Sequence, residues 1–356
     1  MSHEEAMPTP PTNRDIIVVG ASAGGLEALH LLLADLPAAL PAAVFVVLHV
    51  GETSQLTHIL AQASALPVKW AASGEAVERG LVYIAPPGRH LLLHDDHVLL
   101  RRGPRENCAR PAIDPLFRSA AASFGSRVIG VVLSGALSDG TAGLRAIRRC
   151  GGVAVVQDPD DALVPTMPRS ALRYADADHV VPVARMASLL GTLSRQEPGP
   201  TPDIPLGIRL EAAIAAQESG GMQVNDMLGK PSRFTCPECH GALWEIEDGA
   251  MLRYRCHVGH AYTADTVLAS QTEEIDRLLG ALLRSHQERA ALAWRMAEKE
   301  RACGRERLAL QFEQRAGEYA QDAELVRGLL NNGEAGSDMV TNGSLRSSLL
   351  HEEEER

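Results

Sequence analysis

The segment from Asp15 to Leu29 constrains the fold of this chain more than any other part of the sequence. It begins with an apolar run, continues through the sequence GASAG at Gly20–Gly24, and ends in a stretch typical of a helix. The turn fits the pattern G-x-S-x-G, in which a serine between a strand and a helix can act as a nucleophile. The first N–H groups of the helix would then point at whatever Ser22 attacks.

Two other interpretations of this turn are open. A glycine-rich turn between a strand and a helix can bind a nucleotide phosphate, but the pattern G-x-G-x-x-G needs glycine where Ser22 stands. Ser22 could also be a helix N-cap, since a serine hydroxyl accepts a hydrogen bond from a free N–H of the first turn. The segment alone does not separate a nucleophile from a cap.

The first half of the chain, residues 15–195, indicates an α/β domain. Continuous Val, Ile and Leu runs alternate there with amphipathic stretches, which is typical of a doubly wound, mostly parallel sheet covered by helices on both faces. We expect strands at Ile16–Val19, Ala43–Leu48, Leu81–Ile84, Arg127–Leu133, Val153–Val156 and His179–Val181. Helices are expected to begin near Gly24, Ser54, Asp114, Asp139, Pro165 and Ala184, and a hairpin is expected at Leu91–Leu100.

The remaining parts of the chain differ from this domain in composition. Residues 1–14 are polar and are interpreted as a disordered leader, and the proline-rich residues 196–205 as a linker. Residues 266–330 are expected to form a helical hairpin divided at Gly304, with the apolar seam of a coiled coil in its second half. The polar tail, residues 331–356, is predicted to be disordered.

Composition and charge argue against several classes of protein. The formal net charge is -11, whereas proteins that bind nucleic-acid phosphates need clustered positive charge. We therefore expect no nucleic-acid partner. The apolar runs are too short to span a bilayer, so we expect no membrane insertion. Six cysteines in 356 residues are too few for a disulfide framework, and their spacing indicates a metal site in a reducing cytoplasm.

A serine nucleophile needs a base within hydrogen-bond reach and an acid that orients this base. If the first strand is central, the ends of its two neighbours carry His49 and Asp139. Open sheets bind ligands at the carboxyl ends of their strands, so Ser22, His49 and Asp139 are predicted to converge on one crevice. Two alternatives stay open: His179, on a later strand, could be the base, and Asp139 could simply cap a helix.

Six sequence blocks occur between residue 16 and about residue 192 and are highly specific when taken together. They are VGASAGG around Ser22, VLHV around His49, YIAPPGRH from Tyr83, RPAIDPLFR from Arg110, LSGALSDGTAG from Leu133, and QD at Gln157 followed by MP at Met167. In these blocks the chain resembles the catalytic domain of the CheB-type protein-glutamate methylesterases of bacterial chemotaxis. The resemblance implies Ser22 as nucleophile, His49 as base and Asp139 as orienting acid, with backbone N–H groups of Ala23 and Ala136 as oxyanion donors.

The resemblance also implies a substrate and two alternatives. The substrate would be a glutamyl methyl ester on a methylated helical chemoreceptor or a similar signalling protein, and the same machinery could deamidate glutamine. Family members usually carry threonine at Ala23, methionine at Ala136 and glycine at Leu137, so this chain departs from the pattern near the oxyanion site. They also carry a receiver domain, which does not fit before Ile16. A non-catalytic signalling adaptor with the same fold is therefore the rival hypothesis.

A second pattern lies at residues 233–262, where a C-x2-C pair is followed by a Cys/His pair. This spacing strongly indicates a zinc site. Together with the methylesterase-like blocks, it resembles a subgroup of that family in which the esterase domain is joined to a zinc ribbon. The expected ligands are Cys236, Cys239, Cys256 and His260, with His257 as the alternative fourth ligand. Four protein ligands leave no open position, so the zinc would be structural, with no cofactor needed for catalysis.

The C-terminal half, residues 206–330, is expected to set partner choice, assembly or access to the crevice without supplying catalytic groups. Its long helices carry an apolar seam that must be buried against each other or against a partner. Self-association through these helices is one way to bury it.

Overall fold

A computed structural model describes residues 13–49, 55–219 and 221–341 of the protein. The chain divides into two compact units at the boundary between Leu268 and Ala269. Most of the predicted leader, the predicted helix start at Ser54 and the last part of the predicted tail lie outside the described residues. In the part of the chain that is described, no helix is long and apolar enough to cross a membrane.

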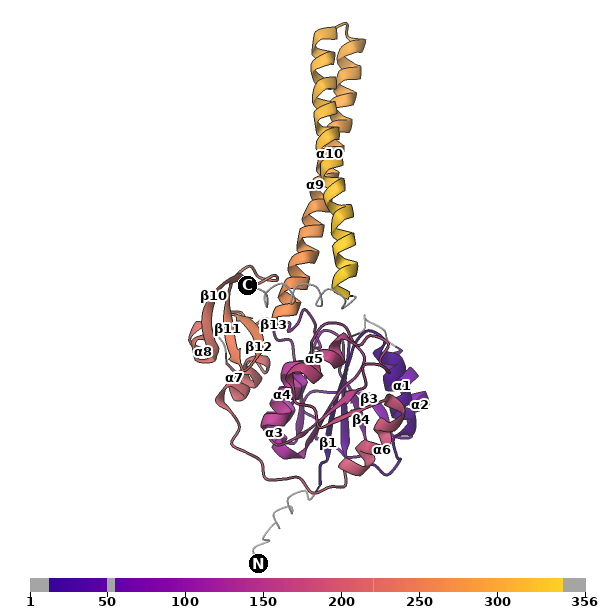
Figure 1. The fold of residues 1–356 in the computed structure, drawn as a ribbon, viewed down its shortest axis with the longest axis vertical. Coiled ribbons are helices and arrows are strands. Elements are labelled where there is room, and N and C mark those ends of the chain that lie inside the picture. The colour runs from indigo at the N-terminus through magenta and orange to yellow at the C-terminus, as the bar shows by residue number, and fades with distance from the viewer. Residues whose placement is uncertain (1–12, 50–54, 220, 342–356) are drawn as a thin grey trace, which may run out of the picture. The chain divides into compact units, whose positions relative to one another are not determined.

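The first unit contains a seven-stranded sheet with helices packed around it (Figure 1). The strand order is β3-β4-β2-β1-β7-β8-β9. All neighbouring strands in it are parallel. The strands are β1 (Ile16–Ala21), β2 (Ala43–Leu48), β3 (Val68–Trp70), β4 (Val82–Ile84), β7 (Val128–Val132), β8 (Val153–Gln157) and β9 (His179–Val181). The first strand is therefore central, with β2 on one side and β7 on the other, which confirms the predicted parallel α/β fold.

Helices cover both faces of this sheet. They are α1 (Gly25–Asp35), α2 (Leu56–Ala63) and α6 (Val183–Leu193) on one face, and α3 (Ile113–Phe124), α4 (Thr141–Arg149) and α5 (Thr166–Tyr174) on the other. Alternate side chains of β1 enter the two cores: Ile17 and Val19 pack with α1, whereas Ile16 and Val18 pack with α3. Burial on both faces explains why the strands appear in the sequence as continuous apolar runs.

A two-stranded hairpin forms a separate small sheet, as the sequence predicts. Its strands are β5 (His90–His94) and β6 (His97–Arg101), which pair antiparallel around a turn with Asp95 at a φ of 49°. The edge strand β3 was not predicted, because it contributes only three half-buried residues to the sheet.

A four-stranded antiparallel sheet follows, in the order β10-β11-β12-β13. Its strands are β10 (Gly229–Thr235), β11 (Ala242–Asp248), β12 (Met251–Cys256) and β13 (Ala261–Thr263), and the short helices α7 (Leu206–Ala215) and α8 (Met222–Leu228) precede it. Its core is small and includes two of the predicted metal ligands, Cys236 and Cys256, beside Tyr254 and Tyr262. So few apolar side chains cannot stabilise a sheet by burial alone.

The helices α9 (Ala264–Ala302) and α10 (Glu306–Thr341) form the predicted hairpin, and Gly304 turns between them with a φ of 74°. Arg289 on α9 lies 3.9 Å from the ring centroid of Tyr319 on α10, and His286 Nδ1 lies 3.4 Å from Asp322 Oδ2. The helix α10 continues past residue 330, where the sequence predicts the tail to begin. Extending an existing helix is much easier than starting one, so a weak helix-forming segment can continue it.

Candidate active site and metal centre

Ser22 is the first residue after β1 and lies at the carboxyl end of the central strand. Its N–H donates to the carbonyl of Ser134, which follows β7, at 3.0 Å. On the other side, the N–H of His49 donates to the carbonyl of Ala21 at 3.1 Å. The ends of three adjacent strands thus meet around Ser22, at the position that the sequence predicts for a crevice.

Two glycines permit the close packing of this turn. Gly24 has a φ of 69°, in the left-handed region, and is the N-cap residue that precedes α1. A Cβ on Gly135 would lie 2.9 Å from the Cβ of Ser22 and 2.6 Å from the sulfur of Met167. Such a side chain cannot fit, so Gly135 allows the loop after β7 to approach the serine.

Hydrogen bonds to the carbonyls of the preceding residues, Ser22 and Gly135, set the directions of the two predicted oxyanion donors. Gly25 N–H donates to the Ser22 carbonyl at 2.8 Å, and Met167 N–H donates to the Gly135 carbonyl at 2.9 Å. The C=O and N–H of one trans peptide point in opposite directions, so these bonds turn the N–H groups of Ala23 and Ala136 the other way. Among the described residues, neither N–H has an acceptor, and both residues are exposed.

His49 and Asp139 are in contact, with His49 Nε2 3.0 Å from Asp139 Oδ2. The Asp139 side chain is almost fully buried and accepts hydrogen bonds from Ile113 N–H, Gly140 N–H and Asn107 Nδ2 at 2.7, 2.9 and 2.9 Å. Burial acts to raise the pKa of Asp139, but His49 and these donors outweigh it and lower the pKa to about 2. Asp139 is therefore ionised at neutral pH.

The alternative base, His179, lies on β9, and β7 and β8 separate that strand from β1. The structure therefore brings His49, and not His179, to the strand beside Ser22. A second buried carboxyl, Asp114, was predicted only as a helix start. Burial and the charge of Asp139 raise the pKa of Asp114 to about 7.

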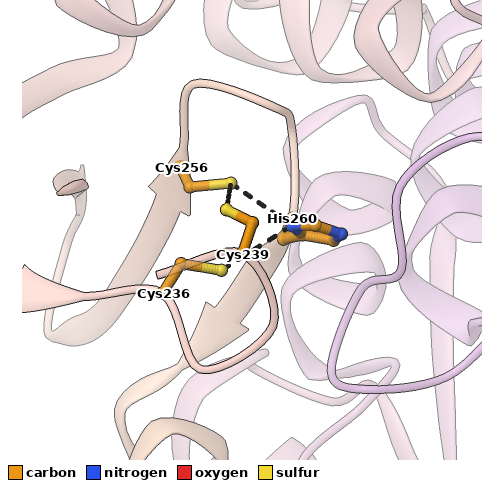
Figure 2. A group of neighbouring side chains, drawn as sticks. All are labelled: Cys236, Cys239, Cys256 and His260. Carbon is orange, nitrogen blue, oxygen red and sulfur yellow. Dashed lines mark hydrogen bonds between the residues drawn. The ribbon is translucent and has the colours of Figure 1, made fainter. Parts of the chain in front are cut away.

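The predicted zinc ligands form one cluster (Figure 2). Their ligand atoms, which belong to Cys236, Cys239, Cys256 and His260, all lie within 4.8 Å of one another. The Cys239 and Cys256 sulfurs are 3.6 Å apart, and His260 Nδ1 is 3.6 and 3.4 Å from the sulfurs of Cys236 and Cys256. Tetrahedral zinc would place two sulfurs roughly 3.8 Å apart, and sulfur and nitrogen roughly 3.6 Å apart. The donor set and its spacing therefore fit zinc.

Backbone turns hold both halves of this cluster. His240 N–H donates to the Cys236 carbonyl at 2.9 Å, and Gly259 N–H donates to the Cys256 carbonyl at 2.9 Å. The other ring nitrogen of His260, Nε2, lies 3.3 Å from a carboxylate oxygen of Glu238, an arrangement typical of metal-binding histidines. His257, the alternative ligand, is exposed and lies against Gly241.

The two buried cysteines of the cluster influence each other's charge. A hydrogen bond from the Cys256 thiol lowers the pKa of Cys236, and the same contact raises the pKa of Cys256. A divalent metal ion would allow both to be thiolates.

Comparisons with known proteins concern the N-terminal half. A family model described as CheB methylesterase matches residues 17–190. A Leptospira interrogans protein with the provisional name protein-glutamate methylesterase/protein-glutamine glutaminase is 39% identical over 180 residues, which cover 50% of this chain and 93% of the relative. A protein of this name, numbered 2, from Anaeromyxobacter dehalogenans is 39% identical over 193 residues, covering 54% of this chain and 57% of the relative.

Among solved structures, the Thermotoga maritima CheB methylesterase catalytic domain is 35% identical, with a TM-score of 0.49. It matches 50% of this chain and 98% of its own chain. The family match ends at residue 190, so the four-stranded sheet and the helical hairpin lie beyond it.

Proposed function

Because this chain belongs to the CheB methylesterase family, we propose that it hydrolyses glutamyl methyl esters on a methylated helical signalling protein such as a chemoreceptor. The observation that carries the proposal is the contact between His49 and the buried Asp139, beside the strand β1 that Ser22 directly follows. Relatives named protein-glutamate methylesterase/protein-glutamine glutaminase support it.

In the proposed reaction, Ser22 Oγ attacks the ester carbonyl and gives its proton to His49. Because Nε2 of His49 faces Asp139, the nitrogen that takes this proton is Nδ1. The N–H groups of Ala23 and Ala136 hold the oxyanion, and the charge of Asp139 stabilises the imidazolium. His49 returns the proton to the departing methanol, and a water molecule then releases the glutamate from Ser22 by the same steps.

The deciding experiment compares the wild type with Ser22→Ala on a receptor carrying labelled methyl groups, and measures the methanol released. Loss of the nucleophile should lower turnover by roughly three to six orders of magnitude. The matched control is Ser188→Ala, which changes an exposed serine on α6. If Ser22→Ala keeps the wild-type rate, Ser22 is not the nucleophile. If the wild type releases no methanol, the adaptor hypothesis replaces the enzyme.

One observation and one chemical argument relate to the alternatives. Leu137, where family members usually have glycine, is in the left-handed region with a φ of 61°, and this departure from the pattern favours the adaptor. The amide of glutamine presents the same carbonyl to Ser22 and would release ammonia in place of methanol. Measuring ammonia from an unmethylated receptor therefore tests the deamidase.

We also propose that Cys236, Cys239, Cys256 and His260 hold one structural zinc ion, with Glu238 hydrogen-bonded to the histidine. When bound, the ion would cross-link β10 to β12 and supply no catalytic step. Three cysteine ligands must stay reduced for this purpose, which favours the cytoplasm as the compartment.

For the helical hairpin we propose association with a second copy. An apolar stripe runs along one flank of the hairpin and consists of Ile275, Leu278 and Leu282 on α9 and Leu325 and Leu329 on α10, with exposed fractions from 46% to 71%. Its members recur every three or four residues, and Leu325 and Leu329 directly precede Val326 and Leu330 of the predicted seam. A second hairpin would continue this packing as a four-helix bundle.

A further inference from the structure

We propose that Asn107 is a positioning residue for the catalytic acid, and that the C-terminal part of the chain holds Asn107 and Asp139 in place through Thr263. This inference rests on the proposed function, in which Asp139 orients His49. In this proposal the four-stranded sheet and the start of α9 support catalysis by holding Asp139 in position, and they do not contact the reacting atoms.

Both ends of the Asn107 side chain are in use. Its amide nitrogen donates to Asp139 Oδ1 and to Asp114 Oδ2, each at 2.9 Å. Its amide oxygen accepts the N–H of Thr263 at 3.2 Å. Because carboxylates lie at one end and an N–H at the other, the amide cannot turn over without losing these bonds.

The backbone around Asn107 also joins the C-terminal sheet. Asn107 N–H donates to the carbonyl of Ala261, on β13, at 2.8 Å. Glu106, the preceding residue, forms an isolated bridge with Ala261. The loop that holds the acid is therefore fixed to β13 by its main chain as well as by its side chain.

Thr263 reaches Asp139 by a second route. Its hydroxyl lies 2.6 Å from the hydroxyl of Ser138, the residue before Asp139. The same hydroxyl accepts the N–H of Thr266 at 3.2 Å and so caps the first turn of α9. Thr263 thus links β13, the start of α9 and two neighbours of the catalytic acid.

A buried charged cluster makes this junction rigid. Glu106 accepts hydrogen bonds from Arg118, on α3, and from Arg255, on β12. Arg255 and Arg253 also bond to Glu211 on α7, and all five side chains are almost fully buried. Separating these elements would leave buried charges unpaired, at a cost of several kcal/mol. The position of Thr263 is therefore set by the C-terminal sheet as a whole.

The contact between Thr263 and Ser138 can be removed from either side. Thr263→Val keeps the shape of the side chain but loses the hydroxyl. Ser138→Ala removes the opposite hydroxyl and leaves the cap on α9, so it serves if Thr263→Val does not fold. Thr263→Ser keeps the hydroxyl and is the matched variant. Asn107→Ala removes the bridge to Asp139 directly.

Each full-length variant would be measured in two ways. Proton NMR follows the N–H on Nε2 of His49, which faces Asp139, and kinetics on a small methyl ester give kcat and KM. We expect Thr263→Val, Ser138→Ala and Asn107→Ala to shift the His49 resonance and to lower kcat roughly tenfold with KM within about twofold. Thr263→Ser keeps the hydroxyl, so its His49 resonance and its kcat should both stay close to those of the wild type.

An unmoved His49 resonance in Ser138→Ala and Asn107→Ala would overturn the proposal, even if kcat falls. The resonance does not depend on turnover. A wild-type protein that shows this signal but no esterase activity would therefore refute the proposed function and leave the positioning role open to the same test.

Discussion

At the scale of single residues, two neighbouring buried carboxyls have different pKa values because only Asp139 faces His49, whereas Asp114 lies beside the charge of Asp139. Asp139 accepts N–H groups from Ile113, Gly140 and Asn107 and faces His49, which lowers its pKa to about 2. Asp114 is equally buried and lies beside the charge of Asp139, which raises its pKa to about 7. Asp139 is therefore ionised at the place where it faces His49.

This difference predicts how stability depends on acid. The pKa of Asp139 is about 2 in the folded chain and about 3.9 in the unfolded chain. Its contribution to the free energy of unfolding is therefore present above pH 4 and is lost as the pH falls through 2. We expect the stability advantage of the wild type over Asp139→Asn to shrink by ~2 kcal/mol between pH 5 and pH 2. Urea unfolding of both proteins measures it.

The control for this prediction is Asp114→Asn. Because the pKa of Asp114 is raised, its effect on stability has the opposite pH dependence. The contribution of Asp114 to the free energy of unfolding is present below pH 4 and is lost as the pH rises through 7. Unfolding curves of wild type and Asp139→Asn that move in parallel with pH would contradict the lowered pKa of Asp139.

At the scale of elements, the sequence predicts most of the sheet because its strands are buried on both faces. The bounds of β2 and β9 were predicted as observed, and β1 runs two residues further than expected, to Ala21. The strand ends also predicted the contact between His49 and Asp139. Short, half-buried or amphipathic pieces such as β3 and α8 carry too few residues for a periodicity to show.

The links to Asn107 could not be predicted in this way. Asn107 and Thr263 are 156 residues apart in the chain, and neither belongs to a motif. Their contact depends on how the seven-stranded and the four-stranded sheets pack together, and this packing involves the buried charges of Glu106 and Arg255. Local pattern contains no information about such long-range pairing.

The metal cluster gives a prediction for the four-stranded sheet. Its core is too small to hold it without the cross-link, so chelation should remove one zinc per chain and raise amide exchange across β10–β13. Because β13 holds Asn107, kcat should fall as well. The measurements are metal analysis and hydrogen exchange on the full chain.

The control for chelation is Cys303→Ser, which changes an exposed cysteine outside the cluster and should keep the zinc. Cys239→Ser should lose it. Purified wild type without zinc, or unchanged exchange in β10–β13 after chelation, would show that the sheet does not depend on the ion.

At the scale of the whole molecule, the apolar stripe on the hairpin predicts a dimer. Replacing two of its side chains in Leu278→Glu/Leu282→Glu puts charges where a second hairpin would pack, so the dimer should dissociate into monomers. Light scattering coupled to size exclusion measures the mass. Gln287→Glu, on the other flank of α9, is the matched control and should remain dimeric. A monomeric wild type at micromolar concentration would contradict the prediction.

The cap at Thr263 also has a consequence for the start of α9. One hydroxyl accepts the N–H of Thr266 at 3.2 Å and lies 2.6 Å from the hydroxyl of Ser138, the residue before Asp139. Because the same oxygen serves both contacts, fraying of the first helical turn and loosening of the residue before the acid are expected to occur together. The order of this one turn is then part of what keeps Asp139 in place.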